Sequence, residues 1–230
     1  MRRTRVSPDG HEIADLVAAL PACRFVLGLA GAPGSGKSTL ATALASTYGV
    51  PVVPMDGFHR PNAELMAMGR LDAKGAPDTF DAEAYAAVLR RLNAGGDVLA
   101  PSFEHGSPDP VPDTITVPCA AGLVVTEGNY LLLDRPEWHG VRRECDAVWH
   151  LVTDDALRVE RLVARHVAAG RSPDDARAWV ARVDRANADL VEAAADAADV
   201  VLDVASWSGR VPHAGARGGH GTTRRPTRHT

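Results

Sequence analysis

The apolar residues of this chain fall into two kinds of pattern, and each kind predicts a different element. Short continuous apolar runs, bounded by polar residues or glycine, are typical of strands buried on both faces of a parallel sheet. Such runs predict five strands, at residues 25–30, 50–55, 123–126, 147–152 and 200–202.

Much of the sequence between these runs has apolar residues three and four positions apart, which is typical of helices. This spacing predicts helices at 11–20, around 40–44, after the capping residue Asp81, at 153–169 and after the capping residue Ser172. Residues 98–117 predict a separate pair of strands. The alternation predicts an α/β fold in three layers, with a parallel sheet, helices on both faces and ligands beyond the C-terminal ends of the strands.

Charge divides the chain into two parts. Residues 209–230 contain five arginines and no acidic residue. Because the whole chain has 25 basic and 29 acidic residues, residues 1–208 carry a net negative charge. We expect one domain at 1–208 and a disordered basic tail at 209–230, either a passive extension or a contact for anionic partners. An acidic domain favours a small-molecule substrate over nucleic acid.

Cysteine usage and hydropathy indicate the cellular compartment in which the protein is expected. The three cysteines are widely separated and form no C-x-x-C pair, so neither a disulfide framework nor a zinc site is expected. No run approaches the ~20 apolar residues that span a bilayer, and no signal peptide follows the N-terminal arginines. A cytoplasmic protein is expected, and the sequence leaves open whether it forms a homodimer.

The segment GAPGSGKST follows the first predicted strand of the core and precedes a helix. It has the Walker A spacing of a P-loop, in which glycines let backbone N–H groups point at phosphates near a helix N-terminus. Lys37 can then reach the β and γ phosphates of ATP, and the Ser38 hydroxyl can bind Mg²⁺. The residues expected to contact the nucleotide are Gly31, Ala32, Pro33, Gly34, Ser35, Gly36, Lys37, Ser38 and Thr39.

Lysine is rare in this chain. Of 25 basic residues only Lys37 and Lys74 are lysines. Because arginine differs from lysine in geometry and hydration, a lysine retained among arginines indicates a need for a compact charge. The same argument makes Lys74, in a loop with little periodicity, a candidate for substrate binding.

Two acidic residues follow predicted strands at the edge where ligands bind. Asp56 follows the strand at 50–55 and could accept a proton from a hydroxyl group held in line with the γ phosphate; the alternative is a turn-forming Asp-Gly pair. Glu127 follows the strand at 123–126 and could hold Mg²⁺, directly or through water; the alternative is a surface glutamate.

Arginines recur on one face of the helix at 153–169. Arg158, Arg161 and Arg165 form a stripe, and Arg171 follows a glycine break. Guanidinium groups on a lid at about 153–187 suit the charge of a transferring phosphoryl group, with Arg161 and Arg165 as catalytic residues and Arg171 at the nucleotide. The alternative is a solvated stripe, because arginine is the common cation of this chain.

The chain resembles the uridine kinase, phosphoribulokinase and pantothenate kinase group of P-loop kinases over about 25–203. The resemblance is carried by Asp56-Gly57-Phe58, Lys74-Gly75, Glu127-Gly128-Asn129 and the arginine-bearing lid. It implies that Asp56 is the catalytic base, that Lys37 and Ser38 serve ATP and Mg²⁺, and that Glu127 assists the metal. The candidate acceptor residues are Asp56, Phe58, His59, Lys74, His105 and Asn187, with helix packing as the alternative for Asn187.

Together these features predict an ATP-dependent kinase that phosphorylates a hydroxyl of a small metabolite. A nucleoside or a sugar is favoured as the acceptor, and pantothenate is the alternative. A member of another class, a P-loop switch or regulatory ATPase that acts on a protein partner, would have no need for an acid after the second strand together with an arginine lid.

Overall fold

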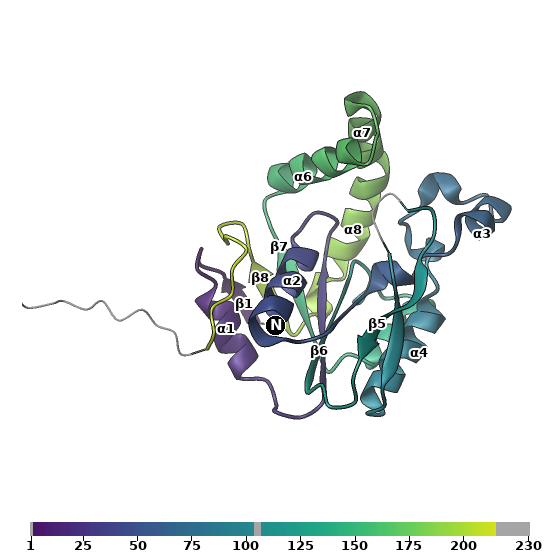
Figure 1. Ribbon diagram of the computed structural model, residues 1–230. Helices are drawn as coiled ribbons and strands as arrows, with labels where there is room; N and C mark the ends of the chain where they lie inside the picture. The colour runs from purple at the N-terminus through teal and green to yellow at the C-terminus, as the bar shows by residue number, and fades with distance from the viewer. Residues whose placement is uncertain (1, 104–106, 215–230) are drawn as a thin grey trace, which may run out of the picture.

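The computed structural model describes residues 2–103 and 107–214 (Figure 1). Its centre is a six-stranded sheet with the order β1-β8-β7-β2-β6-β3, in which every neighbouring pair is parallel. The strands are β1 (Arg2–Arg5), β2 (Phe25–Gly31), β3 (Val52–Pro54), β6 (Leu123–Gly128), β7 (Ala147–Val152) and β8 (Val200–Asp203). An antiparallel pair, β4 (Val98–Ser102) and β5 (Val111–Val117), lies outside this sheet.

Helices connect the strands and cover the sheet. They are α1 (His11–Ala18), α2 (Lys37–Tyr48), α3 (Asn62–Ala67), α4 (Ala82–Asn93), α5 (Pro136–Arg143), α6 (Asp155–Ala168), α7 (Pro173–Trp179) and α8 (Arg185–Ala193). A π-helical turn, Val180–Asp184, joins α7 to α8, and short 3₁₀ turns occur at Met55–Phe58, Leu71–Ala73, Pro77–Thr79 and Ala195–Ala197. No helix in the described ranges is both long enough and apolar enough to cross a membrane.

Two hydrophobic cores lie on opposite faces of the sheet. Successive strand residues point to opposite faces, so that Val26 of β2 packs with Leu89 of α4 while Leu27 packs with Leu40 of α2. Helices α4, α5 and α8 contribute to the first core, and α1 and α2 contribute to the second. The predicted three-layer α/β fold is confirmed.

Most predicted elements are present, but three details differ. The strand expected at 50–55 ends at Pro54, because Met55–Phe58 turns into a 3₁₀ helix. The helix expected from 153 begins at Asp155, where the Asp154 side chain accepts a hydrogen bond from the Leu157 amide. The edge strand Arg2–Arg5 has no apolar run and was not predicted, because it is held by parallel pairing with β8 rather than by burial of its side chains.

The arginine-bearing helix stands apart from the layered body. Figure 1 shows α6 and α7 above the sheet, joined by a turn at Gly170, which adopts φ +95°. Asp154 and Ser172 cap the two helices, and the Ser172 cap was predicted. This arrangement places the arginine helix over the end of the sheet from which β2 leads into the P-loop.

The first residues of the expected tail are packed rather than free. Val211 is 6% exposed and belongs to the core that contains α1 and α2. Its carbonyl accepts a hydrogen bond from Thr47 at 2.9 Å, and the Pro212 carbonyl accepts one from Tyr48 at 3.0 Å. The packed region therefore extends past residue 208, where composition had placed its end, and residues 215–230 lie outside the described part.

Deletion of residues 209–230 is expected to lower the free energy of unfolding by roughly 2–4 kcal/mol, because it removes one buried valine and two hydrogen bonds to α2. Urea denaturation measures this change. The matched control deletes only residues 215–230 and should change stability by less than about 0.5 kcal/mol. Equal effects of the two deletions would contradict the packing role of residues 209–214.

Candidate active site

The P-loop joins the end of β2 to the start of α2, as the motif predicts. Gly34 adopts φ +80°, and a Cβ atom at this position would lie 2.9 Å from both Cγ and the carbonyl oxygen of Arg158. Any larger residue would therefore push the loop away from α6. The loop residues that line the main cavity are Pro33, Gly34, Gly36, Lys37, Ser38 and Thr39, whereas Gly31, Ala32 and Ser35 are not part of the cavity wall.

Lys37 is held inside the loop. Its Nζ donates a hydrogen bond to the Ala32 carbonyl at 3.1 Å, and the residue is only 7% exposed. Burial lowers the pKa of Lys37 to about 8, although Glu127 and Asp56 oppose the shift by favouring the charged ammonium. A cation in this position is ready for the negative charge of a phosphate.

Glu127 and Ser38 meet at the start of α2. The Ser38 hydroxyl donates to Glu127 Oε1 at 3.0 Å, and Glu127 is 8% exposed. Burial, followed by the negative charge of Asp56, raises the pKa of Glu127 to about 7, while Lys37 opposes the shift. The sequence-based alternative, a surface glutamate, does not describe this buried residue.

Asp56 lies in the 3₁₀ turn after β3, at the wall of the same cavity as Lys37 and Glu127. The turn packs tightly against β4, since a Cβ atom on Gly57 would lie 2.3 Å from the Pro101 carbonyl oxygen. Asp56 acts on the pKa values of both Lys37 and Glu127, which shows that the three charges share one electrostatic environment. Three residues from separate strand ends thus converge, as predicted.

These side chains fit Mg²⁺ bound together with a polyphosphate. Ser38 and Glu127 supply a hydroxyl and a carboxylate, and Mg²⁺ is usually held by one or two protein oxygens with water and phosphate completing the shell. No cluster of three or more metal-binding His, Cys, Asp or Glu residues occurs in the described part, so a closed all-protein site is not formed there. The buried Ser35 Oγ has no described hydrogen-bond partner.

The arginines of α6 divide into two groups. Arg161 and Arg165 line the cavity, and Arg161 donates to the Gly34 carbonyl at 3.4 Å. Arg171 also lines it and lies over the Trp179 ring, 4.0 Å from the ring centroid. Arg158 is different, because it is 3% exposed and therefore belongs to no solvated stripe.

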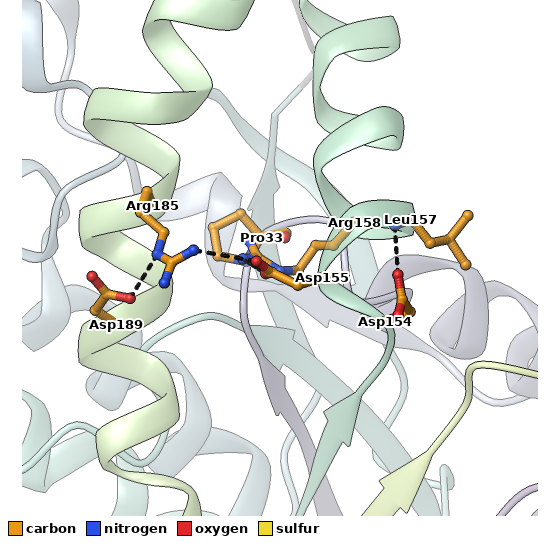
Figure 2. A network of polar contacts seen from close by, with 7 residues as sticks. All are labelled: Pro33, Asp154, Asp155, Leu157, Arg158, Arg185 and Asp189. Carbon is orange, nitrogen blue, oxygen red and sulfur yellow. Dashed lines mark hydrogen bonds and ion pairs between the residues drawn. The ribbon is translucent and has the colours of Figure 1, made fainter.

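Arg158 connects the P-loop to α6 and α8 (Figure 2). Its guanidinium donates to the Pro33 carbonyl at 3.2 Å and forms an ion pair with Asp155. Asp155 also pairs with Arg185 of α8 at 3.2 Å, and Arg185 pairs with Asp189 at 3.0 Å. The position of the loop is thus coupled to α6 and α8, a role that the sequence pattern did not assign to Arg158.

The cavity as a whole has a volume of about 920 Å³, and its wall contains most of the expected acceptor residues. The His59 ring contacts the rings of Phe80 and Phe103, with centroid separations of 4.0 and 4.7 Å. Lys74 and Asn187 line the wall, and Asn187 donates to the Gly75 carbonyl at 3.2 Å.

One expected acceptor residue, Phe58, does not join this wall. Phe58 is buried against Tyr85, with ring centroids 4.7 Å apart, and is not part of the cavity lining. His105 lies outside the described residues. The cavity wall also includes residues that the sequence pattern did not single out. They are Trp179, Phe80 and the His166–Asp184 pair, which is joined at 2.8 Å.

The pKa of Glu127 predicts a pH effect on the protein without ligand. Because the folded state keeps a proton that the unfolded state releases, this residue contributes stability below about pH 4.5 that is lost as the pH rises through about 7. The free energy of unfolding of the wild-type protein should therefore fall by roughly 1–3 kcal/mol across that range, and Glu127→Gln should remove this fall. Denaturation of both proteins in EDTA measures it, and parallel pH profiles would contradict the shift.

Arg158→Met should lower the free energy of unfolding by about 1–3 kcal/mol, because the Pro33 carbonyl loses a buried charged donor. It should also weaken ATP binding, which calorimetry can measure. The matched control is Arg185→Met, whose side chain is 59% exposed and whose ion pairs should contribute about 0–1 kcal/mol. Equal losses in the two variants would rule out a special role for Arg158.

Known proteins resemble this chain in sequence. The sequence profile described as "Phosphoribulokinase / Uridine kinase family" matches residues 26–208. The protein named "Putative uridine kinase C227.14" from Schizosaccharomyces pombe is 35% identical over 194 residues, which cover 78% of this chain and 83% of the relative. A pantothenate kinase from Nocardioides sp. is 39% identical over 120 residues, which cover 49% of this chain and 36% of that kinase.

A solved structure agrees with the sequence matches. The protein described as "putative fructose transport system kinase" from Silicibacter sp. TM1040 has a TM-score of 0.75 and 36% identity, covering 83% of this chain and 97% of that one. The profile match spans most of the chain and confirms the resemblance found in the motifs. The chain belongs to the phosphoribulokinase and uridine kinase family, whose kinases use ATP and in general require Mg²⁺.

Proposed function

We propose that this protein transfers the γ-phosphoryl group of ATP to a hydroxyl of a small metabolite. The observation that carries the proposal is the convergence of Asp56, Lys37 and Glu127 on one cavity beside the P-loop. The loop and Lys37 supply a phosphate site, and Asp56 supplies a proton acceptor next to it. A regulatory ATPase has no acceptor hydroxyl to position, so it has no need for an acid after the second strand together with an arginine lid.

The phosphate end of the cavity would bind the polyphosphate through backbone amides and cations. Lys37 would contact the β and γ phosphates, while Arg161 and Arg165 would face the transferring group from α6. Ser38 and Glu127 would hold Mg²⁺, which supplies charge neutralisation when it is bound. Arg171 would close the nucleotide side of the cavity from the lid.

Asp56 would orient the acceptor hydroxyl and accept its proton. The hydroxyl oxygen forms a bond to the γ phosphorus as the bond between that phosphorus and the β,γ-bridging oxygen breaks, so ADP leaves with the bond's electron pair. Most of the rate enhancement then comes from positioning the two reactants and stabilising charge, and a smaller part from proton transfer.

Names of similar proteins support a sugar or a nucleoside as the acceptor. Two relatives matched over most of their length carry "uridine kinase" and "fructose transport system kinase" in their names. Pantothenate kinases match only about half of this chain. Pantothenate therefore stays as the alternative acceptor.

Asp56→Asn is expected to lower kcat by about 10²-fold or more, because the acceptor hydroxyl loses its proton acceptor, while the Kd for ATP changes little. Coupled measurement of ADP release with a panel of sugars and nucleosides gives kcat, and calorimetry gives the Kd. The control is Asp72→Asn, a change to an exposed acid outside the cavity lining. Full turnover in Asp56→Asn would remove Asp56 from the reaction.

A further inference from the structure

Tyr85 of α4 is a fully buried residue that contacts two segments of the active site at once. Its ring packs against the ring of Phe58 in the 3₁₀ turn that also carries Asp56, with the ring centroids 4.7 Å apart. Its hydroxyl forms a hydrogen bond with the hydroxyl of Thr126, which precedes Glu127 in β6. Tyr85 does not line the cavity, so any effect that it has on a bound ligand passes through these two segments.

The hydroxyl groups of Tyr85 and Thr126 form a hydrogen-bond chain with a defined direction. The Thr126 hydroxyl donates to the Val53 carbonyl of β3 at 2.7 Å. Because a hydroxyl has one proton to donate and a carbonyl has none, Tyr85 is the donor to Thr126. Both side chains are buried, and buried hydrogen bonds arranged in a chain polarise and strengthen one another.

This chain joins the two strands from which Asp56 and Glu127 emerge. Strand β3 has only three residues and lies at the edge of the sheet, where it pairs with β6 within the described part of the chain. Its last residue, Pro54, has no N–H group to donate. The Thr126 hydroxyl therefore adds a side-chain hydrogen bond between the strands just before the backbone turns toward Asp56.

The Tyr85 hydroxyl also lies within electrostatic reach of both acidic residues. Burial raises the pKa of Tyr85 well above its usual range, and Cys145, Glu127 and Asp56 raise it further, although the hydrogen bond with Thr126 opposes the shift. The hydroxyl thus keeps its proton and remains a donor. A hydroxyl inside an apolar core is costly unless it is hydrogen-bonded, and here its partner is the residue that links β6 to β3.

We infer that Tyr85 is a positioning residue for the proposed phosphoryl transfer, because it holds the Asp56 turn and the Glu127 strand end at a fixed separation. The ring supports the turn, and the hydroxyl, through Thr126, supports the strand end. This inference rests on the proposed kinase function and adds to it a residue that touches no ligand. A displacement of about 1 Å between reacting groups can lower a rate about 10²-fold, so loss of this support is measurable in kcat.

Tyr85→Phe removes the hydroxyl and keeps the ring. With an acceptor from the panel of sugars and nucleosides, kcat should fall about 10-fold, because the two acidic residues are no longer held together. The KM for that acceptor and the Kd for ATP should change less than about 2-fold, since Tyr85 does not line the cavity. Steady-state ADP release and calorimetry measure these constants.

The matched control is Tyr48→Phe, which makes the same chemical change at the other end of the P-loop helix. It removes the hydrogen bond from Tyr48 to the Pro212 carbonyl, and kcat should stay unchanged. Equal losses of kcat in Tyr85→Phe and Tyr48→Phe would reduce the effect to general stability and overturn the inference.

Variants of Thr126 test whether the chain acts as a unit. Thr126→Val removes the middle hydroxyl at similar volume and should lower kcat about as much as Tyr85→Phe, whereas Thr126→Ser keeps the hydroxyl and should restore most of kcat. The double variant Tyr85→Phe/Thr126→Val should be no slower than the slower single variant, because both changes break the same chain. Losses that multiply in the double variant would contradict the chain.

Hydrogen exchange measured by mass spectrometry reports on the turn without turnover. In Tyr85→Phe, a peptide that covers residues 55–59 should exchange about 10-fold faster, while a peptide that covers residues 40–48 should not change. Tyr48→Phe should give the opposite pattern. Faster exchange at 55–59 combined with an unchanged kcat would show a contact that is only structural, and the positioning role would be lost.

The inference and the proposed function fail in different ways. Full kcat in Tyr85→Phe, beside a loss of about 10²-fold in Asp56→Asn, would overturn the positioning role and leave the kinase function intact. Failure of the wild-type protein to transfer phosphate to any acceptor of the panel would overturn the proposed function, and the inference with it.

Discussion

The site depends on the burial of two opposite charges, those of Lys37 after β2 and Glu127 in β6, away from water. Lys37 and Glu127 are both largely buried, and burial moves the pKa of each toward its neutral form. Such charges are costly unless they are paired, yet among the described residues the hydrogen bond of Lys37 goes to a loop carbonyl and not to a carboxylate. The fold thus holds an electrostatically unfavourable arrangement that a polyphosphate with its cation would relieve, which is preorganisation for phosphate chemistry.

The rest of the structure keeps these charges in place. Strands β2, β3 and β6 are parallel neighbours, so the segments that follow them meet at one edge of the sheet. Helix α6 contributes through Arg158, a buried cation whose contact with the Pro33 carbonyl fixes the loop to α6 and, through Asp155, to α8. The position of α6 and the geometry of the P-loop are therefore linked by direct contact.

The sequence predicted those features that are determined locally. Strands buried on both faces show as apolar runs, and the P-loop glycines, Asp56 and Glu127 stand at strand ends, so their convergence followed from parallel topology. Features that depend on distant contacts were missed. Arg158 looks like its neighbours in sequence but is buried by the loop, Phe58 packs on Tyr85, and Arg2–Arg5 becomes a strand only by pairing with β8.

The packing of residues 209–214 on α2 has a consequence for the opposite end of that helix. Lys37 and Ser38 open α2, whereas Thr47 and Tyr48, near its last turn, bind the carbonyls of Val211 and Pro212. A boundary for the folded domain drawn at residue 208 would therefore cut the contacts that hold the last turn of the helix whose first turn carries Lys37 and Ser38.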